Sequence, residues 1–193
     1  MERLILRPTS WTRAAVCANM SADMTPEIRM LDDSLAPHFA RLNRAWIERL
    51  YVIEPADEII LASPQRLVDG GGAVLFLLME GEVVGTGDLQ KLDETTAEVV
   101  KMAVDPPQQG KGLGGRIMAA LLDEARRLGF RRAYTGTNGE LAAANGMYLK
   151  YGFKPIGQRT SLHGYVRADM FYELQLNPKD RWNENDRAGY RRH

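Results

Sequence analysis

Four glycines stand close together in residues 110–115, between an apolar run at residues 99–104 and a helical pattern that follows. Pro106 and Pro107 end the apolar run, and the glycines leave the backbone bare where the next helix begins. Such a helix start presents unpaired N–H groups and the positive end of the helix dipole to an anion. The segment therefore predicts a binding site for the phosphates of a cofactor.

Two familiar phosphate-binding motifs fit this segment poorly. A Walker loop requires Ser or Thr after its lysine, but Lys111 is followed by Gly112, so no hydroxyl is placed to hold magnesium. The spacing Gly110-x-Gly112-x-x-Gly115 satisfies the bare dinucleotide pattern. However, that motif needs a tight turn after its strand and an acidic residue at the end of the next one, and the expected strand at 132–137 ends without one.

A third pattern, Gln109-x-x-Gly112-x-Gly114, follows a strand that ends in A-V-D-P. A second motif, Y-x-x-x-G-F, occupies Tyr148–Phe153. With these two motifs the sequence resembles the GNAT superfamily of acyl-coenzyme A dependent N-acetyltransferases, and within it a small, bacterial-type, uncharacterised subset. The resemblance covers residues 27–176. It implies that the loop backbone wraps the pyrophosphate of coenzyme A, which is the binding mode that the helix start already suggests.

The resemblance also implies where acetyl-CoA lies. Its pantetheine arm is expected to enter between two splayed parallel strands and to pair with strand backbone, as an added strand would. Asn138 is the candidate for a hydrogen bond to the pantetheine and Asn145 is second, because Leu141 stands where many members carry asparagine; a turn role for Asn138 stays open. The expected cofactor-binding residues are Met102, Ala103, Val104, Gln109, Gly110, Lys111, Gly112, Leu113, Gly114, Gly115, Asn138 and Tyr148.

Acyl transfer to an amine needs a neutral amine, a stabilised carbonyl oxygen and a proton for the departing thiolate. The resemblance makes Glu98 the general base and Tyr148 the proton donor, with the backbone N–H of Val104 or a neighbour at the carbonyl oxygen. Two alternatives stay open: Glu98 as an exposed residue paired with a lysine, and Tyr151 as the donor. No metal is expected.

The predicted product is an acetylated primary amine, formed by direct attack in a ternary complex; a non-catalytic acyl-CoA sensor is the alternative. The acceptor is a small-molecule or peptide amine. Its expected pocket lies beside the first two helices, where Trp46 is either a wall or core, and Arg167 meets a substrate carboxylate or makes a structural ion pair. Acidic residues there favour a cationic amine, although solvated helix surfaces explain them equally: Glu48, Glu54, Asp57 and Glu58.

Alternating strands and helices are expected to position these residues. The expected strands are 28–30, 73–79, 83–89, 97–104, 132–137, 153–160 and 167–176, and the helices are 35–50, 55–61, 117–128 and one that carries Tyr148. Asp33 or Ser34 is expected to cap the first helix, and Gly129 to end the third. The predicted fold class is α/β, a GNAT fold whose mixed central sheet has antiparallel N-terminal strands and a splayed parallel central pair, flanked by helices.

Length and composition fit one domain. The chain has 193 residues, 45% of them apolar, which is enough for a single buried core. We expect a flexible extension at 1–26, the domain at 27–176 and a polar tail at 177–193. The formal net charge of zero offers no general attraction to nucleic acid or to a membrane surface. The single cysteine, Cys17, makes no intrachain disulfide, a cytoplasmic protein is the default, and a homodimer through the late strands stays open.

Overall fold

The structure is a computed structural model that describes residues 26–157 and 166–177. The strands are β1 (Glu27–Met30), β2 (Ala73–Met79), β3 (Glu82–Lys91), β4 (Thr96–Val104), β5 (Arg132–Thr137), β6 (Lys154–Ile156) and β7 (Met170–Gln175). The helices are α1 (Ala36–Leu50), α2 (Pro55–Ala62), α3 (Gln65–Asp69), the short 3-10 helix η1 (Pro106–Gln108), α4 (Leu113–Arg127) and α5 (Ala142–Lys150).

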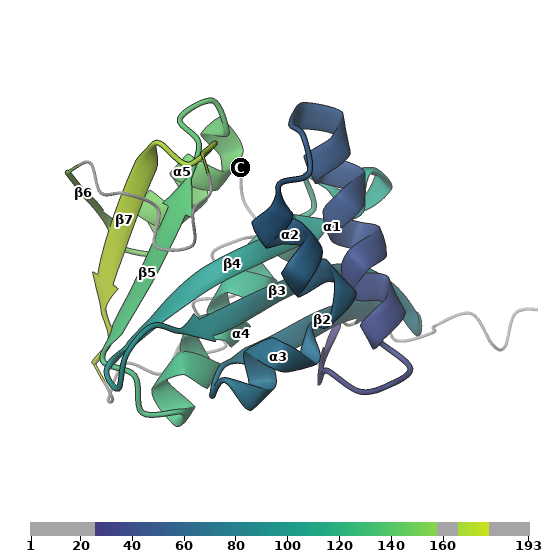
Figure 1. The fold of residues 1–193 in the computed structure, drawn as a ribbon, viewed down its shortest axis with the longest axis horizontal. Helices are drawn as coiled ribbons and strands as arrows, with labels where there is room; N and C mark the ends of the chain where they lie inside the picture. The colour runs from purple at the N-terminus through teal and green to yellow at the C-terminus, as the bar shows by residue number, and fades with distance from the viewer. Residues whose placement is uncertain (1–25, 158–165, 178–193) are drawn as a thin grey trace, which may run out of the picture.

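The described strands form one seven-stranded sheet in the order β1-β2-β3-β4-β5-β7-β6. Every neighbouring pair is antiparallel except β4 and β5, which run parallel and are joined by the crossover helix α4. In Figure 1, α1, α2 and α3 lie over the near face of the sheet, and α4 lies behind it. The predicted fold class, a mixed α/β sheet with antiparallel early strands and one parallel central pair, is confirmed.

Strand β2 is buried on both faces, so it is a continuous apolar run rather than an alternating one. Leu75 and Leu77 join the core cluster that packs against α4. Val74 and Phe76 join the cluster that includes residues of α1, α2 and α3. The sheet is therefore the middle layer of three, and each of its faces has its own hydrophobic core.

Gly85 and Gly87 allow α4 to pack closely on the sheet. A Cβ built at Gly85 would lie 2.8 Å from Cδ1 of Ile117, and one at Gly87 would lie 2.7 Å from Cγ2 of the same residue. Any side chain there would push the helix away. Because α4 begins directly after the glycine loop, this close packing also fixes the position of the loop.

Strands β4 and β5 diverge soon after they begin. Their parallel ladder covers only Thr96–Glu98 and Arg132–Tyr134. On its other side, β4 contains a bulge, because its pairing with β3 shifts by one residue and places both Lys101 and Met102 opposite Gly87. Lys101 has a φ of 49°, a left-handed conformation that costs a non-glycine residue about 1–3 kcal/mol. The far half of β4 thus turns away from β5.

Most expected elements agree with the structure to within a few residues, but two local details differ. The predicted cap of the first helix at Asp33 or Ser34 is wrong: α1 follows Leu35 without a side-chain cap, and Asp32 accepts the N–H groups of Ser34 and Leu35 instead. Helix α3 was not expected, because five residues are too few to show helical periodicity. The predicted end of α4 is confirmed, since Gly129 has a φ of 89°.

Parts of several expectations lie outside the described residues. These parts are residues 1–25 of the N-terminal extension, 158–160 of the strand expected at 153–160, and 178–193 of the tail. Within residues 26–157 and 166–177, no helix combines the length and the apolar character needed to cross a membrane. The same residues contain no group of three or more His, Cys, Asp or Glu side chains placed to hold a metal ion.

Candidate active site

The divergence of β4 and β5 opens a cleft of about 710 Å³, a size typical of cofactor and ligand sites. Strand β4 forms its floor, and the glycine loop with the start of α4 forms one wall. The C-terminus of α1 and the start of α5 also line it. The sequence-predicted residues that line it are Glu98, Met102, Ala103, Val104, Gln109, Gly110, Gly112, Leu113, Gly114, Gly115, Asn138 and Tyr148. Lys111 is the one predicted cofactor residue that does not line it.

The glycine loop is held by its own side chains. Gln109 donates from Nε2 to the carbonyl oxygen of Val104 at 2.9 Å, which ties the loop back to the end of β4. Lys111 donates from Nζ to Oε1 of Gln108 at 2.7 Å, so its side chain braces the loop. Gly110 and Gly112 have φ values of 78° and 77°, conformations that favour glycine.

This loop fits the diphosphate of a coenzyme. Among the contacts within the described residues, the backbone N–H groups of residues 110–115 donate to no backbone or side-chain acceptor, and the first one bonded is that of Arg116, to Gly112. They lie at the positive end of a fifteen-residue helix. N–H groups that donate to no acceptor at a helix start, beside a cleft, form a binding site for an anion.

Glu98 lies on the floor of the cleft, in the last residue pair of the β4–β5 ladder. It is 5% exposed, so the interpretation of Glu98 as an exposed residue at the start of a strand is wrong. A buried carboxylate that still borders a cleft can take a proton from a bound group only if that group enters the cleft. The position suits a general base, and that role stays a prediction.

Tyr148 also borders the cleft and is 6% exposed. Burial raises the pKa of its phenol, a hydrogen bond with the Thr135 hydroxyl lowers that pKa, and the nearby charge of Glu98 raises it again, for a net upward shift. Thr135 in turn donates to the carbonyl oxygen of Val99 at 3.0 Å, which fixes it on β5. Tyr148 is therefore protonated at neutral pH and able to donate a proton.

Tyr151, the alternative donor, has a different environment. Its hydroxyl donates to the carbonyl oxygen of Gly115 at 2.5 Å, and the ring packs in the core against α4. It does not border the cleft. Its position on the same helix as Tyr148 therefore gives it a structural contact with the loop, and the geometry favours Tyr148 as the donor.

Asn138 makes a turn. Its Nδ2 donates to the carbonyl oxygen of Arg167 at 2.9 Å, and its Oδ1 accepts the N–H of Glu140 at 2.9 Å. Asn145 donates to the carbonyl oxygen of Asn138 at 3.0 Å and accepts from the Tyr172 hydroxyl at 2.9 Å. The turn role of Asn138 is confirmed, but Asn138 does not cap the helix that follows, because α5 begins after Leu141 with no side-chain cap among the described residues. A contact between either asparagine and the pantetheine stays a prediction.

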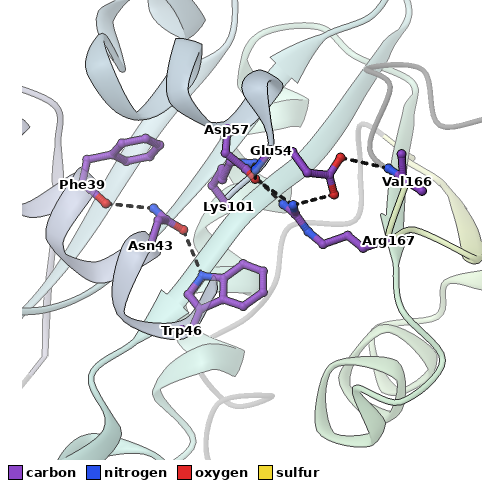
Figure 2. Close-up of polar contacts among 8 residues, drawn as sticks. All are labelled: Phe39, Asn43, Trp46, Glu54, Asp57, Lys101, Val166 and Arg167. Carbon is purple, nitrogen blue, oxygen red and sulfur yellow. Dashed lines mark hydrogen bonds and ion pairs between the residues drawn. The ribbon is translucent and has the colours of Figure 1, made fainter. Parts of the chain in front are cut away.

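Two aromatic residues line the end of the cleft at which the acceptor is expected, Trp46 on α1 and Tyr51 just after it, and this end is called the acceptor end. Their rings meet edge to face, with centroids 6.4 Å apart. Asn43, which is fully buried, holds the indole: it accepts from Nε1 of Trp46 at 3.2 Å and donates to the carbonyl oxygen of Phe39 at 3.0 Å (Figure 2). Trp46 packs on the core and also borders the cleft, so its role as a wall of the acceptor pocket stays a prediction.

The acidic residues of the first two helices are explained by ion pairs. Glu48 and Glu58 both pair with Arg44 on the surface, and Glu54 pairs with Arg167. None of the four acidic residues predicted to shape the acceptor pocket lines the cleft, so the structure gives their charge no direct contact with an acceptor there. For Arg167, the interpretation as a structural ion pair is confirmed, although its side chain also borders the cleft.

The sequence predictions missed Asn43, Tyr51 and Lys101 as residues of this site. Asn43 carries a weak signal, since a polar residue stands on the apolar face of an amphipathic helix three positions before a tryptophan. Tyr51 follows the last helical residue, where periodicity ends. Nothing in the local sequence marks Lys101, because a bulge depends on the register with the neighbouring strand.

Comparison with known proteins agrees with this geometry. Residues 39–153 match the family model described as Acetyltransferase (GNAT) family. The uncharacterized N-acetyltransferase YjgM of Escherichia coli (strain K12) is 29% identical over 161 residues, which make up 79% of this chain and 96% of YjgM. The N-alpha-acetyltransferase RimI of Mycobacterium tuberculosis is 32% identical over 94 residues, 47% of this chain and 58% of RimI.

Solved structures show the same fold. A GNAT-family acetyltransferase from Staphylococcus aureus Mu50 superposes with a TM-score of 0.72 and 19% identity, covering 79% of this chain and 100% of that one. The structure of yncA from Salmonella typhimurium, solved with its cofactor acetyl-CoA, gives a TM-score of 0.65 and 24% identity over 79% of this chain and 94% of that one.

Proposed function

Because the chain belongs to the GNAT acetyltransferase family, we propose that it moves an acetyl group from acetyl-CoA to a primary amine by direct attack in a ternary complex. One observation carries the proposal. The backbone N–H groups of residues 110–115, which donate to no acceptor among the described residues, lie at one end of a single cleft. Glu98 and Tyr148 border that same cleft. Phosphate binding and proton transfer therefore share one continuous site.

The chain's residues divide the work of holding the cofactor. The bare amides of the loop bind the diphosphate, and Gln109 keeps the loop joined to Val104. The edge of β4 that has left β5 offers its backbone groups to an extended ligand, as a sheet edge does in β-augmentation. Acetyl-CoA, when bound, supplies the activated acetyl thioester. Met102 and Ala103 border the cleft and would line the space for its acyl group.

Proton movements are assigned to two buried side chains. Glu98 accepts a proton from the ammonium of the acceptor, directly or through a water, so that the amine can attack. Tyr148 holds a proton at its hydroxyl for the departing thiolate. The backbone N–H of Val104 or of a neighbour is the proposed donor to the developing oxyanion. The acceptor itself is a small-molecule or peptide amine that reaches Glu98 past Trp46 and Tyr51.

The test is release of free thiol from acetyl-CoA by the purified chain across a panel of amines, amino acids and peptides. We expect turnover with at least one class of acceptor. Glu98→Gln should remove most of the rate. Glu94→Gln, an exposed carboxylate paired with Lys91, is the matched control.

Two outcomes would contradict the proposal in different ways. If acetyl-CoA binds in calorimetry but no acceptor in the panel releases thiol, the chain is an acyl-CoA sensor instead of a transferase. If Glu98→Gln keeps the wild-type rate, the transferase stands but Glu98 has no part in the mechanism.

A further inference from the structure

Four charged side chains from three distant segments meet in one cluster, and two of them, Lys101 and Arg167, border the cleft (Figure 2). Asp57 of α2 receives Nζ of Lys101 at 2.8 Å and both terminal nitrogens of Arg167 at 2.7 Å each. Arg167 also donates to Glu54 at 2.9 Å, and Glu54 accepts the N–H of Val166 at 3.0 Å. The cluster joins α2, β4 and the segment that precedes β7.

The centre of this cluster is withheld from water. The side chains of Asp57 and Lys101 are 0% and 4% exposed, and that of Arg167 is 14% exposed. Burial alone would raise the pKa of Asp57, but the hydrogen bonds from Arg167 and Lys101 outweigh it and hold the pKa at about 2. The two acids and two bases balance in charge. Buried ion pairs contribute little net stability compared with apolar replacements, so a role in specifying geometry is worth testing.

Lys101 is also the residue at which β4 changes direction. It occupies the bulge with a left-handed φ of 49°, a conformation that persists only where surrounding contacts hold it. The pairing of β4 with β5 ends at Glu98, before the bulge, and residues of β4 on both sides of the bulge border the cleft. The ion pair with Asp57 therefore anchors β4 within the part that no longer pairs with β5.

Arg167 extends the same anchor to the acceptor wall. Its guanidinium carbon lies 5.9 Å from the ring centroid of Tyr51, and both residues border the cleft. Asp57 also accepts the backbone N–H of Glu54 at 2.9 Å, which holds the start of α2. One buried carboxylate thus contacts the bulge, the start of α2 and the cation that packs over the acceptor wall.

We propose that Asp57 and Lys101 are positioning residues for the proposed acetyl transfer. Their ion pair fixes the bulge, and so aims the backbone of Met102–Val104 at the cofactor, while the pair between Asp57 and Arg167 sets the acceptor wall relative to it. This inference rests on the proposed function. Neither residue needs to touch a reacting atom for the role, because errors of about 1 Å in placement already cost up to about a hundredfold in rate.

The experiment separates the two arms of the cluster. Lys101→Met removes one charge, keeps an unbranched side chain and leaves Asp57 bonded to Arg167. We expect it to fold, to bind acetyl-CoA about tenfold more weakly in calorimetry and to lower kcat by about tenfold or more. Arg167→Met should instead raise the acceptor KM about tenfold and leave the Kd for acetyl-CoA near the wild-type value.

Two further variants give the controls. Lys101→Arg restores the charge and should recover most of the affinity for acetyl-CoA. Lys101→Gly removes the charge and the backbone strain together, and it should be as defective as Lys101→Met. Glu58→Gln breaks a surface ion pair on the same helix, with Arg44, and should match the wild type in Kd, KM and kcat.

The inference is overturned if Lys101→Met keeps the wild-type Kd and kcat, or if Lys101→Gly is fully active, since backbone conformation alone would then position β4. Melting temperatures close to the wild-type value show that any defect is local. If the wild-type chain binds acetyl-CoA and turns over while Lys101→Met equals it, only this inference fails. If the wild-type chain does not bind acetyl-CoA, the proposed function fails first.

Discussion

The two ends of the cleft use different chemical groups: one end uses backbone groups and the other uses side chains. The cofactor end, residues 102–115, offers backbone groups. They are the edge of a strand and a row of N–H groups that donate to no acceptor in the described part of the chain, in a loop shaped by two glycines with positive φ. The acceptor end offers side chains, and other side chains fix them by hydrogen bonds: Trp46 donates to Asn43, and Arg167 donates to Asp57. A backbone site depends on the local conformation, whereas a side-chain site depends on which distant segments meet.

This difference tells us which substitutions each end tolerates. At the cofactor end, the identity of a side chain matters little as long as the backbone keeps its shape, so changes that alter φ should be the harmful ones. At the acceptor end, the backbone is ordinary helix or strand, and loss of one charged or polar partner leaves another buried group unsatisfied. Glu98 and Tyr148 lie where the two ends join.

The largest effect is expected at that junction. Tyr148→Phe should lower kcat by about a hundredfold or more, because it removes the proposed donor, while the Kd for acetyl-CoA changes little. Since burial and the charge of Glu98 raise the pKa of Tyr148, the wild type should lose activity from this phenol only at a higher pH than an ordinary tyrosine would give. Steady-state kinetics and calorimetry on the same preparations measure both quantities.

Tyr151→Phe is the matched control for this prediction. It removes the hydroxyl that donates to Gly115, so it should lower the melting temperature and leave kcat much closer to the wild-type value. A large loss of kcat in Tyr151→Phe together with a mild one in Tyr148→Phe would reverse the assignment of the donor.

A second prediction tests whether the cofactor end depends on backbone shape. Gly110 and Gly81 have φ values of 78° and 83°, and in both cases a built Cβ meets nothing within 4 Å. Replacing either with alanine should therefore cost a similar amount of stability, about 1 kcal/mol, from strain alone. Only Gly110→Ala should weaken acetyl-CoA binding, by about tenfold, because each 1.4 kcal/mol of lost contact is a factor of ten.

Thermal unfolding and calorimetry on the two alanine variants check this pair. Equal losses of acetyl-CoA affinity in both would mean that Gly110→Ala acts through general destabilisation. An unchanged Kd in Gly110→Ala would show that the loop does not use its backbone to bind the cofactor.

The same contrast explains what could be predicted from the sequence. The strand, the glycine loop and the start of α4 were all visible, because a φ that favours glycine and a helix start are local properties. The sequence left open whether Glu98 is exposed and whether Tyr151 is the donor, because the burial of Glu98 and the contact of Tyr151 with Gly115 both depend on packing. The fold class followed from the order of the elements together with the family resemblance, since a crossover helix such as α4 allows the two strands that it joins to run parallel.

The acceptor end was not predictable for a physical reason. The charged residues that pair there lie up to 113 positions apart in the sequence: Glu54, Asp57, Lys101 and Arg167. Their charges alone do not show which of them pair. The acidic residues of the first two helices therefore suggested a cationic substrate, whereas in the structure they neutralise the protein's own cations. The strand register also determines on which face of the sheet Lys101 lies, because a shift of one residue would place it on the other face.

The smallest predicted effect concerns Asp88, a buried carboxyl near this cluster. It lies on β3 next to Gly87, whose position faces α4, so alternation places Asp88 on the opposite face. Both of its carboxyl oxygens lack a hydrogen-bond partner among the described residues. Burial raises its pKa well above the ordinary value, although the charge of Lys101 opposes the shift. Asp57 is therefore left as the ionised partner of Lys101.

Asp88→Asn should raise the melting temperature at neutral pH by a few degrees, at about 2–4 °C per kcal/mol in a chain of this length. The folded state holds a proton on Asp88 that the unfolded chain releases above its ordinary pKa of 3.8, so the wild type loses stability as the pH rises from about 4. Asparagine does not titrate, and the advantage of the variant should shrink toward zero near pH 4. If the variant melts lower than the wild type at pH 7, Asp88 is ionised and shares Lys101 with Asp57, and the acceptor end then rests on a larger charge network than the one described above.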